Sequence, residues 1–365
     1  MRVLDTRALN RALLARQFLL RRAKTTPFDA IRHLVGMQAQ APFPPYFGLW
    51  SRLHGFAPDD LARLLLDRSV VRIALMRGTV HLVTADDALM LRPLVQPLLD
   101  RQLRVNPTYS VPLAGLDLPK VAAEARAVLA DAPRTAAELG KALAQRRPDC
   151  PPGALGFAAR ALLPLVQIPP RAVWGRSGQP TYATAEDWLG RPLDSQPSPD
   201  ELVLRYLAAF GPATVQDIQA WSGLTRLGEV TDRLRPRLEV FANEKGRELF
   251  DLPDAPRPDP DTPAPPRFIA GFDNLLLSHD DRTRVMPEEA RKRVFGTRNG
   301  VVPGTLLVQG FVRGAWRIAR EPGRAVLCLE PYQRISTKDM AALESAGRRL
   351  LAFAAPGDEH DLLVG

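Results

Sequence analysis

A repeated helix-start motif constrains this chain more than any other feature of its sequence. Segments 133–139 and 212–218 share the pattern Pro-x-Thr-x-x-acid-aliphatic. In such a motif the Thr hydroxyl accepts the backbone N–H three residues on, and the acid at that position completes a capping box. Apolar-periodic helices, 121–129 and 202–210, precede the two copies. A repeated pair of helices predicts repeated structural units rather than one continuous layer.

The second copy is followed by the elements of a winged helix. A turn at 221–224 contains Gly223, and a helix is predicted over 225–234. Helix, helix, Gly-containing turn and helix is the helix-turn-helix order. Strands are predicted over 238–241 and 247–252, joined across 243–246, and would form its wing. For the preceding unit, block 162–188 with its Gly175–Gly178 turn is the candidate wing.

The first segment, roughly 1–106, shows the same order of elements. Helices are predicted from Pro27 to Gly36 and over 45–53 and 58–67, followed by a hairpin over 70–83 that turns at Arg77-Gly78. Three helices followed by a hairpin is the order of a winged helix, so the sequence predicts three such units in tandem. The start of the chain is rich in Leu and Arg, as in a transit peptide, but its amphipathic pattern favours a folded first helix.

A different region follows the third unit. Seven of the 14 residues in 253–266 are Pro, which predicts a stiff, extended linker. Beyond it, 304–333 has the pattern of a β-meander with turns at Arg313-Gly314 and Pro322-Gly323, and 337–353 that of an amphipathic helix. We therefore predict an α+β fold with three tandem winged-helix (helix-turn-helix) domains and a small C-terminal β-barrel-like domain. The predicted domain boundaries are 1–112, 113–195, 196–255 and 256–365.

The charge of the chain favours a polyanionic partner. Lys and Arg number 49 against 40 Asp and Glu, a net charge of +9, and Arg supplies nearly all of the cations. Segment 1–106 holds 16 of these cations against 8 acids. Arg binds phosphate bidentately, and basic helix-turn-helix units bind DNA. The predicted third recognition helix is mixed in charge, so some units are expected to brace the structure; its charged residues are Arg226, Glu229, Asp232 and Arg233.

Several common functions lack their motifs. The sequence has no Gly-rich phosphate loop ending in Gly-Lys-Ser/Thr, no His-Glu-x-x-His and no Cys-x-x-Cys. Cys150 and Cys328 stand alone, which favours a reduced chain. No apolar run is long enough to cross a membrane. We expect a cytoplasmic monomer that needs no metal or organic cofactor.

The segment Gly36-Met37-Gln38-Ala39-Gln40-Ala41-Pro42 is the strongest candidate for a functional site. The prolines that follow favour an extended backbone, in which residues i and i+2 point to the same side. Gln38 and Gln40 would then present two carboxamides able to hold a water or to contact a base edge. The alternative, that both amides only satisfy loop backbone, is favoured by these residues alone.

Three motifs together resemble the AlkZ-type (YcaQ-like) winged-helix DNA glycosylases. They are the Gln38–Gln40 segment, the hairpin 75–83, and Phe272-Asp273-Asn274-Leu275-Leu276-Leu277-Ser278-His279-Asp280-Asp281-Arg282-Thr283-Arg284. The resemblance implies three winged helices and a β-barrel around a cleft for duplex DNA, and excision of alkylated purines, including bulky or crosslinking N7 adducts. It also implies that the Gln-x-Gln pair, Gln38 and Gln40, is catalytic, as in the branch linked to resistance against DNA-alkylating natural products.

The remaining candidate residues are basic or polar and would bind DNA or support the site. Thr79 and His81 share one side of the hairpin, and His81 is equally compatible with a buried core histidine. Arg282 and Arg284 would contact phosphate or pair with Asp280 and Asp281, alternatives that the sequence leaves open. The other candidates are His279, Arg291, Lys292, Arg293 and Arg298, the last four in a basic stretch that is one candidate for the DNA-engaging hairpin of the family.

An amide pair limits the chemistry that this site can perform. Gln does not titrate near neutrality, so it orients water without acting as a general base. For a glycosylase of the kind that the resemblance implies, we therefore expect activity on purines whose positive charge already weakens the glycosidic bond. The lack of a suitably placed Lys for a Schiff base predicts a monofunctional enzyme. The rival hypothesis is a non-catalytic winged-helix regulator or scaffold.

Overall fold

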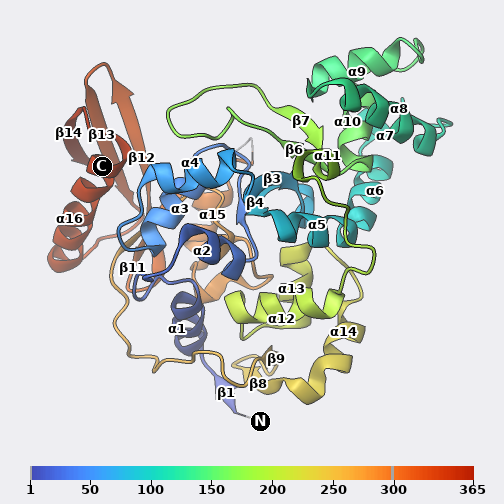
Figure 1. The fold of residues 1–365 in the computed structure, drawn as a ribbon. Helices are drawn as coiled ribbons and strands as arrows, with labels where there is room; N and C mark the ends of the chain where they lie inside the picture. The colour runs from blue at the N-terminus through green and yellow to red at the C-terminus, as the bar shows by residue number, and fades with distance from the viewer. Residues whose placement is uncertain (1, 297–299) are drawn as a thin grey trace.

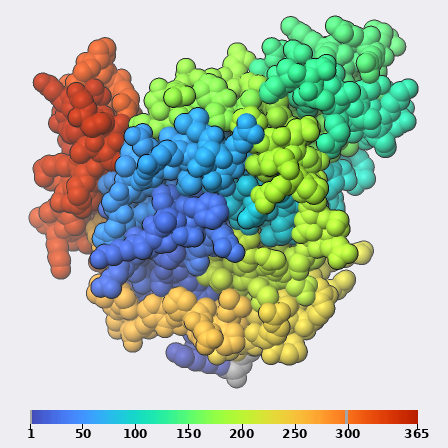
Figure 2. All heavy atoms as spheres, in the orientation of Figure 1, coloured from blue at the N-terminus to red at the C-terminus, as the bar shows by residue number. Residues whose placement is uncertain are grey.

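The structure is a computed structural model that describes residues 2–296 and 300–365 (Figure 1). Its described strands form three sheets, with the strand orders β2-β4-β3-β6-β7-β5, β1-β8-β9 and β10-β11-β12-β13-β14. The fold is therefore mixed α+β, as predicted. Helices α8, α9 and α10 stand out from the rest of the molecule at the upper right of Figures 1 and 2.

The first two predicted units share one six-stranded sheet. Its strands are β2 (Met37–Gln38), β3 (Val70–Ala74), β4 (Val80–Thr84), β5 (Arg134–Thr135), β6 (Leu165–Gln167) and β7 (Thr181–Thr184). Ile73 of β3 lies opposite His81 of β4 and also opposite Val166 of β6. The two hairpins are thus joined edge to edge, which buries the backbone N–H and C=O groups that each would otherwise expose.

The helices of these two units include the predicted ones and several that the sequence did not predict. They are α1 (Thr6–Arg16), α2 (Pro27–His33), α3 (Pro44–Arg52), α4 (Pro58–Leu66), α5 (Ala85–Leu94), α6 (Gln96–Val105), α7 (Pro107–Ser110), α8 (Leu118–Asp131), α9 (Ala136–Ala144), α10 (Pro152–Leu162) and α11 (Ala185–Leu189). The predicted folded first helix is confirmed as α1. The Thr135–Glu138 capping box is confirmed at the start of α9.

The third unit also has its predicted elements. They are α12 (Pro199–Phe210), α13 (Val215–Ser222), α14 (Leu227–Leu234), the 3-10 turn η2 (Arg235–Arg237), β8 (Glu239–Asn243) and β9 (Glu248–Asp251). The Thr214–Asp217 capping box starts α13, and Gly223 ends it with a φ of 79°. A side chain at Gly223 would meet Leu98 and the backbone of Arg77. The N-terminal strand β1 (Val3–Leu4), which the sequence analysis missed, pairs parallel with β8.

The C-terminal region contains an open sheet, so the predicted barrel-like domain is wrong. Its elements are β10 (Arg267–Ile269), η3 (Asn274–Leu276), η4 (Arg282–Arg284), α15 (Glu288–Phe295), β11 (Gly304–Val308), β12 (Phe311–Glu321), β13 (Arg324–Pro331), α16 (Thr337–Ala354) and β14 (Glu359–Val364). Strands β10 and β14 lie at opposite edges of the sheet and do not pair with each other. Closure would need such pairing.

One turn of the meander also differs from its prediction. The β11–β12 turn lies at Gln309-Gly310, where both residues have positive φ, as type I′ hairpin turns require. The predicted turn residue Gly314 instead lies inside β12. A Cβ there would approach the backbone oxygen of Glu330 to 2.6 Å, so Gly314 permits close strand packing and does not form a turn.

The Pro-rich segment 253–266 is tied to the protein by arginines of α1. Arg7 Nε donates to the carbonyl of Pro260 and Arg11 Nε to that of Thr262, both at 2.7 Å. In Figure 2 the orange atoms of this segment lie below the blue N-terminal helices. Arg7 and Arg11 thus hold the Pro-rich segment against α1, a role that no local sequence pattern indicates.

A buried ion pair at the same place fixes the third unit to α1. Both terminal nitrogens of Arg16 donate to the Asp251 carboxylate, at 2.7 and 2.8 Å, and neither side chain is exposed. Such a pair is costly to break because the remaining charge stays buried.

We expect the substitution Asp251→Asn to lower the free energy of unfolding by about 3–5 kcal/mol, because Arg16 would lose a charged partner. The control is Asp261→Asn, which removes the exposed Arg7–Asp261 pair and should change stability by less than about 0.5 kcal/mol. Urea unfolding of the three proteins measures both differences. Equal loss in the two variants would contradict the assigned role of the buried pair.

Candidate active site

The guanidinium of Arg77 joins three distant parts of the chain. Arg77 lies in the β3–β4 turn, η1 (Met76–Gly78), with a φ of 57°. Its Nη2 donates to Gln38 Oε1 at 2.7 Å and to Asn274 Oδ1 at 2.8 Å, and its Nη1 donates to the Trp221 carbonyl at 2.6 Å. Burial, with repulsion from Arg282, lowers the pKa of Arg77 to about 10, so the group stays charged at neutral pH.

The end of helix α13 helps to hold this charge. The Trp221 carbonyl belongs to the last turn of α13, where the helix dipole favours a cation. Gly223 ends the helix there and leaves room for the backbone of Arg77. The contact between the first hairpin and the third unit is therefore both steric and electrostatic.

Gln38 is held in one orientation by Arg77. Because a guanidinium only donates hydrogen bonds, the Gln38 atom that faces it is the oxygen. The Gln38 side chain is 7% exposed, and its Nε2 forms no hydrogen bond with the described residues. Strand β2 positions it because Gln38 pairs with His81 of β4. Gly36 precedes it with a φ of 88°, where a side chain would clash with Val83.

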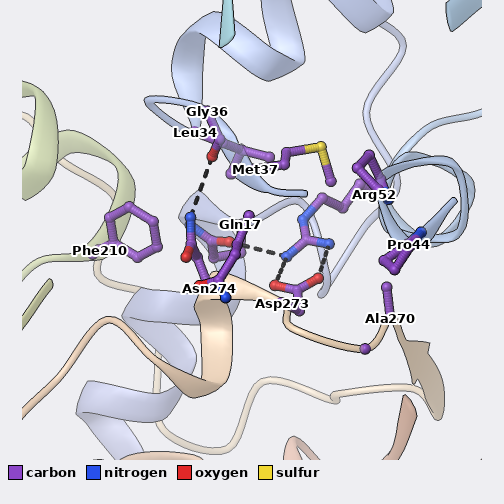
Figure 3. Close-up of a pocket in the computed structure, with 13 residues that line it drawn as sticks. Gln17, Leu34, Gly36, Met37, Pro44, Arg52, Phe210, Ala270, Asp273 and Asn274 are labelled. Atoms are coloured by element: carbon purple, nitrogen blue, oxygen red, sulfur yellow. Dashed lines mark hydrogen bonds and ion pairs between the residues drawn. The ribbon is translucent and has the colours of Figure 1, made fainter. Parts of the chain in front are cut away.

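A small cavity lies beside Gln38. Its lining combines β2, α3, Gln17 and the 270–274 segment, and Figure 3 shows its polar side. The centre of a water molecule can occupy about 10 Å³ inside this cavity, which is roughly the space that one ordered water needs. Its further lining residues are Leu34, Gly36, Met37, Pro44, Pro45, Arg52, Phe210, Ala270, Gly271, Asp273 and Asn274.

A buried ion pair forms one wall of this cavity. Arg52 of α3 donates two hydrogen bonds to the Asp273 carboxylate, both at 2.8 Å, and one to Gln17 Oε1 at 3.1 Å (Figure 3). Gln17 in turn donates to the Ala209 carbonyl. Both Asp273 oxygens are therefore occupied, and the pair fixes α3 against the 270–274 segment.

Gln40 does not line the cavity. Its side chain is exposed, and its Oε1 accepts the Val80 backbone N–H at 3.3 Å. Thr79 is half-buried, and its hydroxyl donates to the Met76 carbonyl at 3.1 Å. The structure thus places both glutamines beside β4, with Gln38 against the cavity and Gln40 toward solvent.

His81 is a buried, neutral histidine. Its Nδ1 faces the Thr79 carbonyl at 3.0 Å, so this nitrogen carries the proton, and Nε2 faces Arg77 Nη2 at 3.5 Å. Burial, with repulsion from Arg77, lowers the pKa of His81 to about 3. His81 thereby helps to orient Arg77 without adding a second charge.

The cluster near residue 280 is largely internal. His279 is 2% exposed, donates from Nε2 to the Phe210 carbonyl and accepts from Ser278 at Nδ1. Burial, with repulsion from Arg284, lowers its pKa to about 3. Arg284 is buried, donates to the Pro212 carbonyl at 2.7 Å and lies 3.6 Å from Asp217. Side chains buried in this way support the fold and do not reach DNA phosphates.

Arg282 is half-buried, and its guanidinium lies 4.5 Å from the centre of the Phe295 ring. Among the described residues, neither Arg282 nor Arg284 forms an ion pair with Asp280 or Asp281, the pairing that the sequence left open. Those acids instead face Arg247 and Lys245.

The basic stretch after residue 290 is mostly helical. Arg291, Lys292 and Arg293 are exposed on α15, where Arg291 pairs with Glu288 and Arg293 lies 5.0 Å from the centre of the Tyr332 ring. Arg298, the last basic candidate, lies outside the described residues.

Sequence reasoning missed the residues that organise this site. Arg77, Asp273 and Asn274 lie within the three motifs, but the motifs assign them no role, and none of the motifs contains Arg52. The signal that was available for Arg77 is its place in a turn beside Gly78. Within residues 2–296 and 300–365, no cluster of three or more His, Cys, Asp or Glu could hold a metal ion. No helix in that part of the chain is both long and apolar enough to span a membrane.

Comparisons with known proteins identify the class of protein. The family model described as "DNA glycosylase AlkZ-like" matches residues 31–353. The chain is 23% identical over 338 residues to an interstrand DNA cross-link repair glycosylase of Streptomyces sahachiroi, covering 83% of this chain and 85% of that protein. The solved structure of the S. sahachiroi DNA glycosylase AlkZ matches the fold with a TM-score of 0.80 at 20% identity, over the whole of both chains.

The protein is an enzyme of the DNA glycosylase class. More narrowly, it belongs to the AlkZ-like DNA glycosylase family. The predicted resemblance is therefore confirmed, and the rival hypothesis of a non-catalytic regulator is set aside.

The pKa of His81 generates a prediction about stability. The unfolded chain binds a proton at His81 near pH 6.5, whereas the folded protein excludes it down to about pH 3. The free energy of unfolding should therefore fall as the pH falls below 6.5, with a slope that approaches about 1.4 kcal/mol per pH unit. His279 acts in the same direction.

Urea unfolding between about pH 5 and pH 7.5 tests this prediction, and His81→Gln should show a shallower slope than the wild type. Equal slopes for His81→Gln and the wild type would contradict the assigned neutral state of His81.

Proposed function

We propose that this glycosylase hydrolyses the N-glycosidic bond of N7-alkylated, cationic purines in duplex DNA, with water positioned by Gln38 and Gln40. Interstrand crosslinks are included, because a relative described as an interstrand DNA cross-link repair glycosylase aligns over most of the chain, and the proposal extends to bulky adducts. The observation that carries the proposal is the fixed Gln38 amide, held by Arg77 beside a cavity of about one water.

The orientation of Gln38 favours positioning over proton abstraction. Its oxygen accepts from a cation, which polarises the amide and makes its free N–H groups better donors. Those donors can hold the oxygen of a water while the glycosidic bond breaks. Gln40 lies outside the cavity, and its oxygen is likewise engaged by a backbone N–H; its free amide donors, at the solvent side of β4, are proposed to hold the water as it enters.

The size of the cavity restricts how the damaged base is handled. A purine is far larger than one water, so the proposal places water in the cavity and keeps the base outside it. A bulky lesion is then cleaved without being inserted into a tight pocket, unlike most base-flipping enzymes.

The charges of the site suit a substrate whose leaving base is already activated by its own positive charge. A cationic N7-alkylpurine is a good leaving group and needs no general acid, while the sugar develops oxocarbenium character. The Asp273 carboxylate is fully engaged by Arg52, which leaves the amides to orient the nucleophile. No Lys is among the described residues that line the cavity, which supports a monofunctional enzyme without a Schiff-base lyase step.

DNA binding in this proposal uses the exposed cations and three winged-helix units. Arg291, Lys292 and Arg293 on α15, with Arg282 nearby, are proposed phosphate contacts; Thr79, His81, His279 and Arg284 are proposed supporting residues. The protein is proposed to act as a cytoplasmic monomer.

Substitution of Gln38 should reduce catalysis with little effect on binding. We expect Gln38→Ala to lower the single-turnover rate of 7-methylguanine release by about 100-fold, because the water loses its fixed donor. Gln40→Ala should lower it by a smaller factor. Release is measured as strand scission after mild alkaline heating.

Gln145, exposed at the end of α9, provides a matched control, and Gln145→Ala should release base as the wild type does. The catalytic assignment fails if Gln38→Ala and Gln40→Ala both retain the wild-type rate. A wild-type protein that releases no base would refute the proposed substrate class.

The absence of a titrating base among the proposed catalytic residues predicts the dependence on pH and lesion. Because amides do not titrate, the single-turnover rate on 7-methylguanine should be flat between about pH 5 and pH 8. Duplex containing the neutral lesion 8-oxoguanine should release little base. A carboxylate limb in the rate of the chemical step, or efficient removal of the neutral lesion, would contradict this mechanism.

A further inference from the structure

A second cavity, which shares no lining residue with the cavity beside Gln38, is lined by several arginines. It measures about 480 Å³ and lies between the segment after α1, the end of α3, the start of β10 and helix α16. Arg21, Arg22, Arg267 and Arg349 line it together with His54. The described residues that line it include no Asp or Glu. The rest of the lining is Leu20, Trp50, Pro265, Pro266, Phe268, Ala342 and Ala346.

The guanidinium groups of this cavity repel one another. Burial, followed by repulsion from the charges of Arg22 and Arg349, lowers the pKa of Arg267 to about 10. Burial and Arg349 likewise lower the pKa of Arg22. Like charges at short range destabilise the fold unless an opposite charge offsets them.

The hydrogen bonding of these groups is incomplete. Arg22 forms no hydrogen bond or ion pair with the described residues, and its guanidinium lies 4.5 Å from the centre of the Trp50 ring. Within the part of the chain that the structure describes, the Arg267 guanidinium makes two long bonds, both at 3.3 Å, to the carbonyls of Pro266 and Leu20. By contrast, the buried Arg16 and Arg52 each have a bidentate carboxylate.

We propose that this cavity is a binding site for a phosphate group, held by Arg21, Arg22, Arg267 and Arg349. Stacking on Trp50 orients Arg22 and leaves its N–H groups available, and guanidinium forks match phosphate oxygens. The phosphate comes either from the DNA backbone outside the active site or from a small phosphate ester. The site is independent of the base-releasing residues, since none of them lines it.

Titration with pyrophosphate at constant ionic strength tests the site. Wild-type protein should bind pyrophosphate, and Arg21→Gln/Arg349→Gln should bind it at least about tenfold more weakly, since each lost bond to a charged partner has a large effect. Both residues are exposed, so folding should survive. In phosphate-free buffer the variant should unfold at the same or a higher temperature, because repulsion is relieved.

Arg348 is the matched control, because it is exposed on the same helix but does not line the cavity. Arg348→Gln should bind pyrophosphate as the wild type does. The proposal is overturned if wild-type protein does not bind pyrophosphate, or if the double variant binds it equally well. The single variant Arg349→Gln decides the matter if the double variant does not fold.

The salt dependence of binding to undamaged duplex identifies the source of the phosphate. If DNA occupies the site, the double variant should show a slope of log K against log salt that is shallower by about one or two units. If pyrophosphate binding is lost and the slope is unchanged, the site takes a small phosphate ester. Base release by the double variant at saturating enzyme reports the proposed glycosylase activity separately.

Discussion

The hydrogen bonds of the Arg77 guanidinium are the interactions on which the architecture of the candidate active site depends. This half-buried cation of the first hairpin holds Gln38 of β2, Asn274 of the C-terminal region and the last turn of α13. Three acceptors, including the Trp221 carbonyl at a helix C-terminus, offset the loss of water around its charge. The orientation of Gln38 follows from that requirement, since only an amide oxygen can face Arg77.

Arginine serves several functions in this protein, and net charge alone does not separate them. Arg16 and Arg52 are buried against carboxylates, and Arg7 and Arg11 bind the Pro-rich segment. These side chains join parts of the chain that are distant in sequence. The excess of cations therefore overstates the surface available to DNA, and only the exposed or unpaired groups remain for phosphate.

The group beside the cavity is an amide and His81 is neutral, so neither exchanges a proton near neutral pH. His81 is kept neutral by its burial beside Arg77, and Asp273 is kept occupied by Arg52. A site of this kind orients and polarises but exchanges few protons. That property fits the proposed substrate, in which positive charge on the leaving base already weakens the bond, and it agrees with membership of the AlkZ-like DNA glycosylase family.

Local rules explain what the sequence predicted correctly. The capping boxes at Thr135 and Thr214, the first helix and the hairpin around Arg77 each depend on residues a few positions apart, so their patterns are visible in the sequence. The family was predictable as well, because its three motifs are contiguous. By contrast, the sequence wrongly places the β11–β12 turn at Arg313-Gly314, because a glycine there has the same local pattern as a turn. Gly314 instead permits a close approach between strands, and the turn lies at Gln309-Gly310.

The tertiary structure alone decided which side chains meet. The pairing of β3 with β6, the open C-terminal sheet, the Arg52–Asp273 bridge and the Arg77–Asn274 bond all join residues far apart in the chain. No periodicity or spacing encodes such contacts, because they depend on how complete elements pack and on which buried charges find partners. The sequence thus determined many of the elements and the candidate amides, whereas packing decided that Gln38 lines the cavity and that Gln40 faces solvent.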